Sequence, residues 1–321
     1  MAVHAFISAM LTILTAIIPN FLLIMLGWGM RSRHWLDISF WGQAERLTYY
    51  LLLPALLITN LAEARLDGLP VAAIAAAQGL AILAVLGLIA LPLRRFWPRL
   101  ATDGPAFTSL IQGSVRPNTY IAFAVAAALW GPSGVTVAAV SAALVVPLVN
   151  LLCVTALIQW GQGDGRRGFG PTLAAIVKNP LILACLLGAA LNLSGIGLPP
   201  MIGPMLKIMA QASLALGLLC VGAGLDLGAI RGAGMVVATT LTIKLLALPS
   251  AVAGLGWLFG LRGVQLAAAI VYAAVPVATN AYVLARQLGG DYRLAAAIIT
   301  ASTLAAAATL PVAAIVIARL P

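Results

Sequence analysis

The chain has 321 residues, of which 63% are hydrophobic and only 8% are charged. A soluble protein carries about 25% charged residues, so this composition excludes a water-soluble enzyme with an ordinary polar surface. A membrane-spanning helix needs about 20 mostly apolar residues, and the chain has room for about ten of them with short connections. The sequence therefore predicts an all-α membrane protein with about ten transmembrane helices.

The apolar runs follow one another along the chain and define the predicted spans. They are Thr12–Met30, Ser39–Leu61, Leu69–Leu91, Phe107–Leu129 and Val135–Gln159 and, after a polar glycine-rich connection, Asn179–Leu193, Met205–Gly224, Met235–Phe259, Val264–Leu288 and Leu294–Ala318. The runs are continuous and show no alternation of period two, which favours helices over a β-barrel. The first run has no basic start and no cleavage site, so we interpret it as a retained span.

The net charge of +10 is carried by basic residues in the short connections. The connections after odd-numbered spans hold Arg31, Arg33, Arg94, Arg95, Arg99, Arg166, Arg167, Arg231 and Arg293, and those after even-numbered spans hold Arg65, Lys207, Arg262 and Arg319. Because cytoplasmic loops are enriched in Lys and Arg, this asymmetry predicts a multi-pass protein of the bacterial cytoplasmic membrane with both termini outside. This role in membrane orientation also accounts for the positive net charge, so we predict no nucleic-acid partner.

Residues with catalytic or metal-binding chemistry are scarce. Cys153, Cys185 and Cys220 lie in apolar runs without a CxxC spacing and are interpreted as small buried hydrophobic residues. The two histidines, His4 and His34, lie near segment ends. The sequence contains no paired carboxylates, activated nucleophile or metal cluster, so we predict no enzyme, no cofactor and no metal site.

The polar connection divides the chain into two halves of five spans each, residues 1–160 and 172–321, joined by a cytoplasmic linker at residues 161–171. Two related halves with an odd number of spans must cross the bilayer in opposite directions, an architecture common in secondary transporters. Pro117 precedes Gly131 by the same interval that separates Pro276 from Gly290. Both pairs lie in the fourth span of their half, which predicts inverted repeats whose spans four and nine are broken.

Polar residues follow both prolines. Asn118 and Thr119 follow Pro117, and Thr279 and Asn280 follow Pro276. Proline frees backbone carbonyls in mid-span, and Asn and Thr side chains can cap the helix that restarts. Two helix N-termini at the middle of the membrane would form a receptor for an anionic group. The alternative is two ordinary proline kinks, but their occurrence in both halves favours a site.

At these residues the chain resembles the auxin efflux carriers and their bacterial relatives, which include malonate- and malate-transporter-like proteins. The resemblance runs nearly end to end and is carried by Tyr49–Leu56 (YYLLLPAL), Arg116–Ile121 (RPNTYI), Val146–Asn150 (VPLVN), Lys178–Leu181 (KNPL) and Ala285–Asp291 (ARQLGGD). The family transports small organic anions, which are auxin in plants and dicarboxylates in some bacterial members. The long hydrophilic central loop of many plant members is reduced here to Gly161–Gly170.

The resemblance implies a ten-helix fold related to the bile-acid/sodium symporters. In that fold the broken spans four and nine cross near the membrane centre, and a crossover bundle (spans 3–5 and 8–10) moves in an elevator-like manner against a static bundle (spans 1, 2, 6 and 7). By motif position, Pro117 and Asn118 would lie at the first crossover and Pro276 and Asn280 at the second. Pro54 and Thr59 would lie on the span-two wall that faces the site. Carriers with this fold often form homodimers.

Charged residues within the spans refine the predicted site. Arg116 is the candidate for binding a carboxylate, and the alternative is that it snorkels or pairs with Glu45 or Asp103. Lys244 is interpreted as a structural or gating charge. Tyr120 and Tyr282 complete the predicted substrate-binding set. No Asp or Glu adjoins either break in the sequence, so no sodium site is evident, and we expect proton or potential coupling, or uniport.

The sequence therefore predicts a secondary transporter that exports a small organic anion. A passive pore is the alternative, although it would need a continuous polar path, and the spans supply few polar residues away from the breaks.

Overall fold

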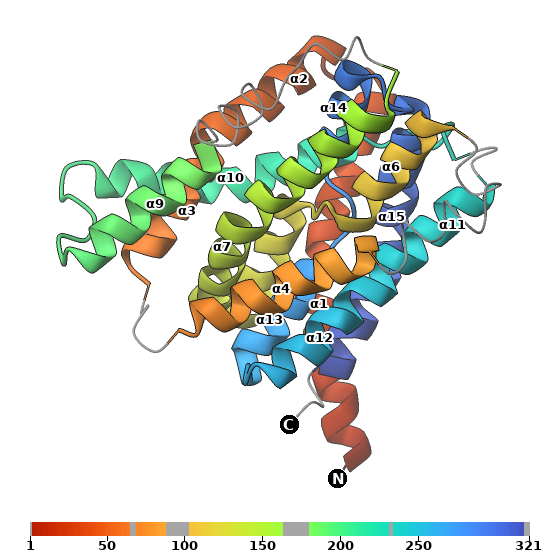
Figure 1. The fold of residues 1–321 in the computed structure, drawn as a ribbon. Helices are drawn as coiled ribbons and strands as arrows, with labels where there is room; N and C mark the ends of the chain where they lie inside the picture. The colour runs from red at the N-terminus through yellow and green to blue at the C-terminus, as the bar shows by residue number, and fades with distance from the viewer. Residues whose placement is uncertain (1, 65–68, 88–102, 163–179, 231–233, 318–321) are drawn as a thin grey trace.

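The computed structural model describes residues 2–64, 69–87, 103–162, 180–230 and 234–317, and these residues are helical apart from short connections and breaks (Figure 1). Five helices in the described part are long and apolar enough to cross a membrane: Leu11–Ser32, Thr119–Trp160, Gly203–Ala223, Gly234–Leu258 and Tyr292–Ile317. Shorter apolar helices accompany them. The protein is thus an all-helical, multi-pass membrane protein, and the ten-span inverted repeat stays a prediction.

Several sequence predictions fall outside the described residues. They include most of the linker at residues 161–171 and the basic residues Arg65, Arg94, Arg95, Arg99, Arg166, Arg167, Arg231 and Arg319. The predicted orientation of the termini depends largely on these residues. It is a prediction that the described helices do not test.

One group of helices is built from α1 (Ala2–Ser32), α2 (Ile38–Leu47), α3 (Leu53–Ala62), α9 (Pro180–Leu193) and α10 (Gly203–Ala223). Within this group α1 packs along α10, and α3 packs between α9 and α10. Glycines allow the close approach: a Cβ atom at Gly222 would lie 1.7 Å from the carbonyl oxygen of Ile24, and one at Gly188 would lie 2.9 Å from Leu61. Small residues of this kind permit tight helix packing in a membrane, where lipid is as apolar as the side chains.

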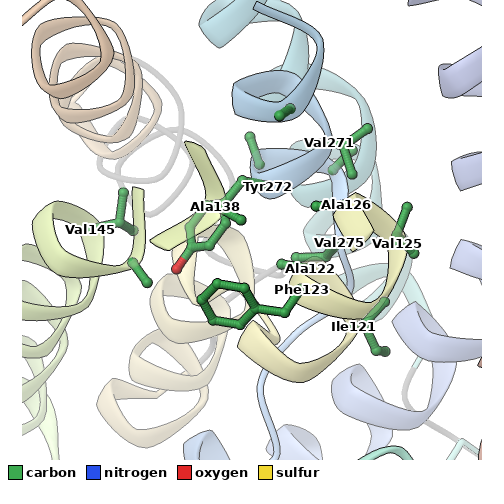
Figure 2. Close-up of a cluster of buried hydrophobic side chains, with 14 of the residues drawn as sticks. Ile121, Ala122, Phe123, Val125, Ala126, Ala138, Val145, Val271, Tyr272 and Val275 are labelled. Carbon is green, nitrogen blue, oxygen red and sulfur yellow. The ribbon is translucent and has the colours of Figure 1, made fainter. Parts of the chain in front are cut away.

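A second group contains α4 (Val71–Val85), α6 (Gly104–Val115), α7 (Thr119–Trp160), α11 (Gly234–Thr242), α12 (Leu248–Leu258), α13 (Gly263–Ala274), α14 (Asn280–Leu288) and α15 (Tyr292–Ile317). Its core lies where α7 crosses α13. Figure 2 shows the buried rings of Phe123 on α7 and Tyr272 on α13 lying toward one another, with alanine and valine side chains around them. This core holds the two broken helices together.

Two helices contain a π-helical segment just before a proline. The segment Thr48–Leu52 (η1) joins α2 to α3, and Ile243–Ala247 (η4) joins α11 to α12. Pro54 and Pro249 lie in the first turn of the helices that follow. Because proline cannot donate to the preceding turn and its ring collides with a carbonyl there, the wider turn accommodates it. The predicted spans Ser39–Leu61 and Met235–Phe259 therefore pass through these prolines.

The fourth and fifth predicted spans meet at a tight junction. Two helices within α7 (Thr119–Trp160) join at Gly131, whose φ of 56° and ψ of −142° are not helical. Residues with side chains rarely adopt this conformation, so glycine is required. The predicted equivalent, Gly290, does not have a positive φ. It is Gly289, with a φ of 76°, that ends α14 in the left-handed conformation.

Candidate functional site

The first predicted break is present at residues 116–118. Helix α6 ends at Val115, and Arg116 is extended (φ −76°, ψ 112°) because the residue before a proline avoids the helical region. Helix α7 begins at Thr119, and Asn118 is its N-cap: the side-chain Oδ1 of Asn118 accepts a hydrogen bond of 3.3 Å from the N–H of Ile121. The predicted cap of the first restarted helix is confirmed.

The second predicted break is present after α13. Helix α13 ends at Ala274, and Val275 is extended before Pro276 for the same reason. Helix α14 then begins at Asn280. Both α6 and α13 have 12 residues and end two residues before a proline, so the two breaks lie at equivalent places along their helices.

The two breaks meet. The N–H of Asn118 donates a hydrogen bond of 2.8 Å to the carbonyl of Pro276, and Pro117 forms an isolated antiparallel bridge with Val277. The N–H of Val277 donates to the hydroxyl of Ser302 on α15 at 3.1 Å. Backbone groups released by the breaks thus find partners inside the protein, as the low-dielectric membrane requires. Helix α7 begins two residues after Pro117, and α14 begins four residues after Pro276.

The amide of Asn118 has a defined orientation. Its Oδ1 accepts the hydrogen bond from the N–H of Ile121, so the Nδ2 amino group is the part of the amide that is left to donate to another partner. Asn118 is only 1% exposed, and this Nδ2 has no hydrogen-bond partner among the described residues. An unpaired buried donor is costly, so the position favours a ligand that can accept a hydrogen bond.

The amide of Asn280 is oriented in a similar way from the other break. Its Oδ1 accepts a hydrogen bond of 2.7 Å from Nη1 of Arg116, and a guanidinium can only donate. The Nδ2 of Asn280 is therefore left as a donor, and the residue is exposed. Both asparagines direct their oxygen atoms to donors of the protein, which leaves their amino groups for a ligand.

Arg116 is 2% exposed and has two amide partners, Asn280 and Asn150. The pairings with Glu45 or Asp103 that the sequence left open are not formed: Asp103 caps α6 by accepting from Ala106, and Glu45 accepts from another residue. Sequence reasoning missed Asn150, although it ends the VPLVN motif. Asn150 is a polar residue within an apolar span, and this could have indicated that it belongs to the site.

Thr279 differs from its predicted role. It precedes α14 as the N-cap residue but makes no side-chain cap. Its hydroxyl instead donates a hydrogen bond of 2.9 Å to Oε1 of Glu45 on α2. An acidic side chain therefore approaches the second break in space, although none adjoins it in the sequence.

The remaining predicted residues are only partly gathered here. Thr119 is the half-buried first residue of α7, and Tyr120 is buried against Gly217 of α10. Tyr282 packs edge-on against Tyr292, with ring centroids 5.8 Å apart, on the side of α14 away from Asn280.

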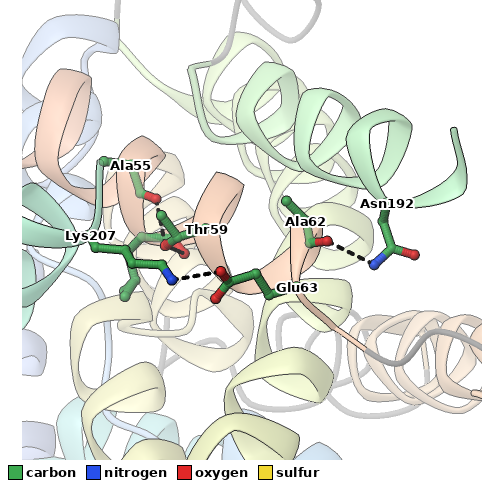
Figure 3. A network of polar contacts seen from close by, with 7 residues as sticks. Ala55, Thr59, Ala62, Glu63, Asn192 and Lys207 are labelled. Carbon is green, nitrogen blue, oxygen red and sulfur yellow. Dashed lines mark hydrogen bonds and ion pairs between the residues drawn. The ribbon is translucent and has the colours of Figure 1, made fainter. Parts of the chain in front are cut away.

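Thr59 lies on α3, where its hydroxyl donates to the carbonyls of Ala55 and Leu56 in its own helix (Figure 3). Pro54 lies at the start of the same helix. No described contact therefore brings the Thr59 hydroxyl to the breaks. The neighbouring ion pair between Lys207 and Glu63 (Figure 3) joins α10 to the end of α3.

Residues 171–314, which include the second break, match the family model of membrane transport proteins. The match covers less than half of the chain and supports the predicted resemblance to this family. This part of the chain is similar to membrane transporters. No curated protein matches the chain.

The protein also buries Lys244, which is fully inaccessible on η4. Its Nζ donates a hydrogen bond of 2.8 Å to the carbonyl of Ala273, in the last turn of α13. A cation at a helix C-terminus interacts favourably with the exposed carbonyls there. Lys244 therefore stabilises the end of α13 just before the second break.

A cavity of about 350 Å³ lies elsewhere in the transporter, between α1, the kink of α7, the start of α13 and the end of α15. Its lining is mainly apolar and includes Ile13, Leu129 and Leu266. None of the predicted site residues lines it. The crossing of the breaks is therefore the candidate functional site.

Proposed function

We propose that the transporter is a secondary carrier of a small organic anion that bears a carboxylate. The observation that carries the proposal is the pair of oriented amides, Asn118 and Asn280, at the crossing of the two breaks. A carboxylate only accepts hydrogen bonds, and the free groups of both amides only donate them. The N-termini of α7 and α14 add the positive ends of two helix dipoles.

The proposed mechanism is alternating access, with elevator-like motion of the second helix group against the first. The two groups meet near the site through few polar contacts, of which Thr279 to Glu45 is one. Tyr120 packs against Gly217 at the same boundary. These contacts can separate without breaking either helix group, which supports the motion.

The proposed direction is export across the bacterial cytoplasmic membrane. Asn280 is exposed and Asn118 is buried, so a solute would reach the site from the side of α14. Helices α2 and α14 lie at one end of the molecule, and α1 begins at the other (Figure 1). With the predicted termini outside, the open side would face the cytoplasm. Coupling to protons or to the membrane potential is part of the proposal.

Counterflow in proteoliposomes tests the proposal. A thermal-shift screen of mono- and dicarboxylates selects the probe, which is then used in radiolabelled form outside liposomes loaded with the same unlabelled compound. A carrier accelerates uptake when unlabelled substrate is inside, because exchange avoids the return of the empty site. A rate that is independent of internal substrate would indicate a passive pore and contradict the proposal.

A further inference from the structure

Arg116 connects three helices at the crossing. It follows the last residue of α6, its Nη1 donates to Asn280 at the start of α14, and its Nη2 donates to Asn150 in the second half of α7. The guanidinium is thus held from two sides within the protein.

The positive charge of Arg116 has no acidic partner in the described part of the chain. Both oxygen atoms that accept from it belong to neutral amides. Its Nε is buried and has no hydrogen-bond partner among the described residues. Arginine remains protonated in proteins, and a buried charge without a counter-charge is strongly unfavourable. Among the described residues, the buried guanidinium therefore has no counter-charge in direct contact with it.

We propose that Asn150 is a positioning residue that holds Arg116 in place through a neutral oxygen. The guanidinium then orients the amide of Asn280 and supplies the charge that one carboxylate of the substrate neutralises. This inference deepens the proposed function and rests on it, because it assigns the counter-charge of the transported anion. A neutral anchor is essential, since an acidic residue at position 150 would itself neutralise Arg116.

The first test needs no ligand and compares the unfolding temperatures of purified Asn150→Asp and Asn150→Leu with that of the wild type. Asn150→Asp provides the missing counter-charge at nearly constant volume, so its unfolding temperature rises. Asn150→Leu removes the anchor, so its unfolding temperature falls. Asn192→Asp is the matched control: Asn192 donates to the carbonyls of Ala62 and Ala64, and an aspartate there lowers the unfolding temperature. If the unfolding temperature of Asn150→Asp were no higher than that of Asn150→Leu, the inference would be overturned.

The second test measures binding with matched probes: acetate, benzoate and indole-3-acetate, each beside its primary amide. At least one carboxylate, and not its amide, stabilises the wild type. Asn150→Asp weakens the binding of that carboxylate by about 10- to 100-fold, the loss expected for a charged hydrogen bond. Wild-type affinity in Asn150→Asp would overturn the inference. A wild type that responds to no carboxylate would instead count against the proposed function, and the unfolding test would still decide whether Arg116 lacks a counter-charge.

Discussion

The N–H of Asn118 donates a hydrogen bond of 2.8 Å to the carbonyl of Pro276. This single backbone contact joins the break between α6 and α7 to the break between α13 and α14. It fixes two helix N-termini beside each other in the interior of a membrane protein. The side chains at these termini can then act on one ligand.

Asn118→Ser and Asn118→Ala separate the capping role of Asn118 from its ligand-binding role. Serine keeps an oxygen that accepts from Ile121, whereas alanine removes it, at a cost of about 1 kcal/mol in the free energy of unfolding. Neither residue has the amino group, so both variants lose carboxylate transport. Thermal unfolding and proteoliposome uptake measure the two effects. Wild-type uptake by Asn118→Ser would exclude the amino group from the site.

Arg116→Lys tests the fork geometry of the guanidinium. A single ammonium group cannot hold the oxygens of Asn150 and Asn280 in the same arrangement, although it keeps the charge. We expect the affinity for the carboxylate to fall by about 10- to 100-fold while the protein remains folded. Concentration-dependent uptake measures this loss. Unchanged affinity would show that charge alone suffices at this position.

Glu45→Cys combined with Thr279→Cys tests movement between the two helix groups. These residues are in contact across the boundary, so a short bifunctional reagent should link the cysteines and arrest exchange. Glu63→Cys with Lys207→Cys is the matched control, because that pair joins α3 and α10 within the first group. Its cross-link should leave exchange intact. Equal exchange rates for both cross-linked proteins would contradict the proposed motion.

Gly222→Ala should destabilise the protein by about 3 kcal/mol, because the new methyl group would overlap the backbone of α1. Helices α1 and α10 would have to separate. Gly254→Ala is the control, since nothing lies within 4 Å of a Cβ atom there, and alanine favours the helix by up to about 1 kcal/mol. Thermal unfolding in detergent distinguishes them. Similar unfolding temperatures for the two variants would contradict the packing described for Gly222.

The breaks could be predicted because their cause is local. A proline restricts the residue before it and removes a hydrogen bond from its own turn, so Pro117 and Pro276 indicate the interruptions directly. The cap at Asn118 follows from the same local rule. The family resemblance could likewise be recognised from short motifs around these residues.

The partners of the site could not be predicted, because they depend on contacts between distant parts of the chain. Asn150 and Glu45 reach the breaks from other helices, and no local spacing indicates this. The shared proline-to-glycine interval does not carry over to the backbone conformation, since the left-handed residue after α14 is Gly289 and not Gly290. A polar side chain such as Thr59 can satisfy itself within its own helix.

The affinity ratio between a carboxylate and its uncharged primary amide tests most directly whether both breaks contact the same group of the substrate. It is measured by equilibrium binding to the wild type, Asn118→Ser and Asn280→Ala. We predict a strong preference for the carboxylate in the wild type and a smaller preference in each variant, in which Arg116 still supplies its positive charge. A variant that binds the carboxylate with the wild-type preference would show that its asparagine does not contact that group, and a shared anion site would be excluded.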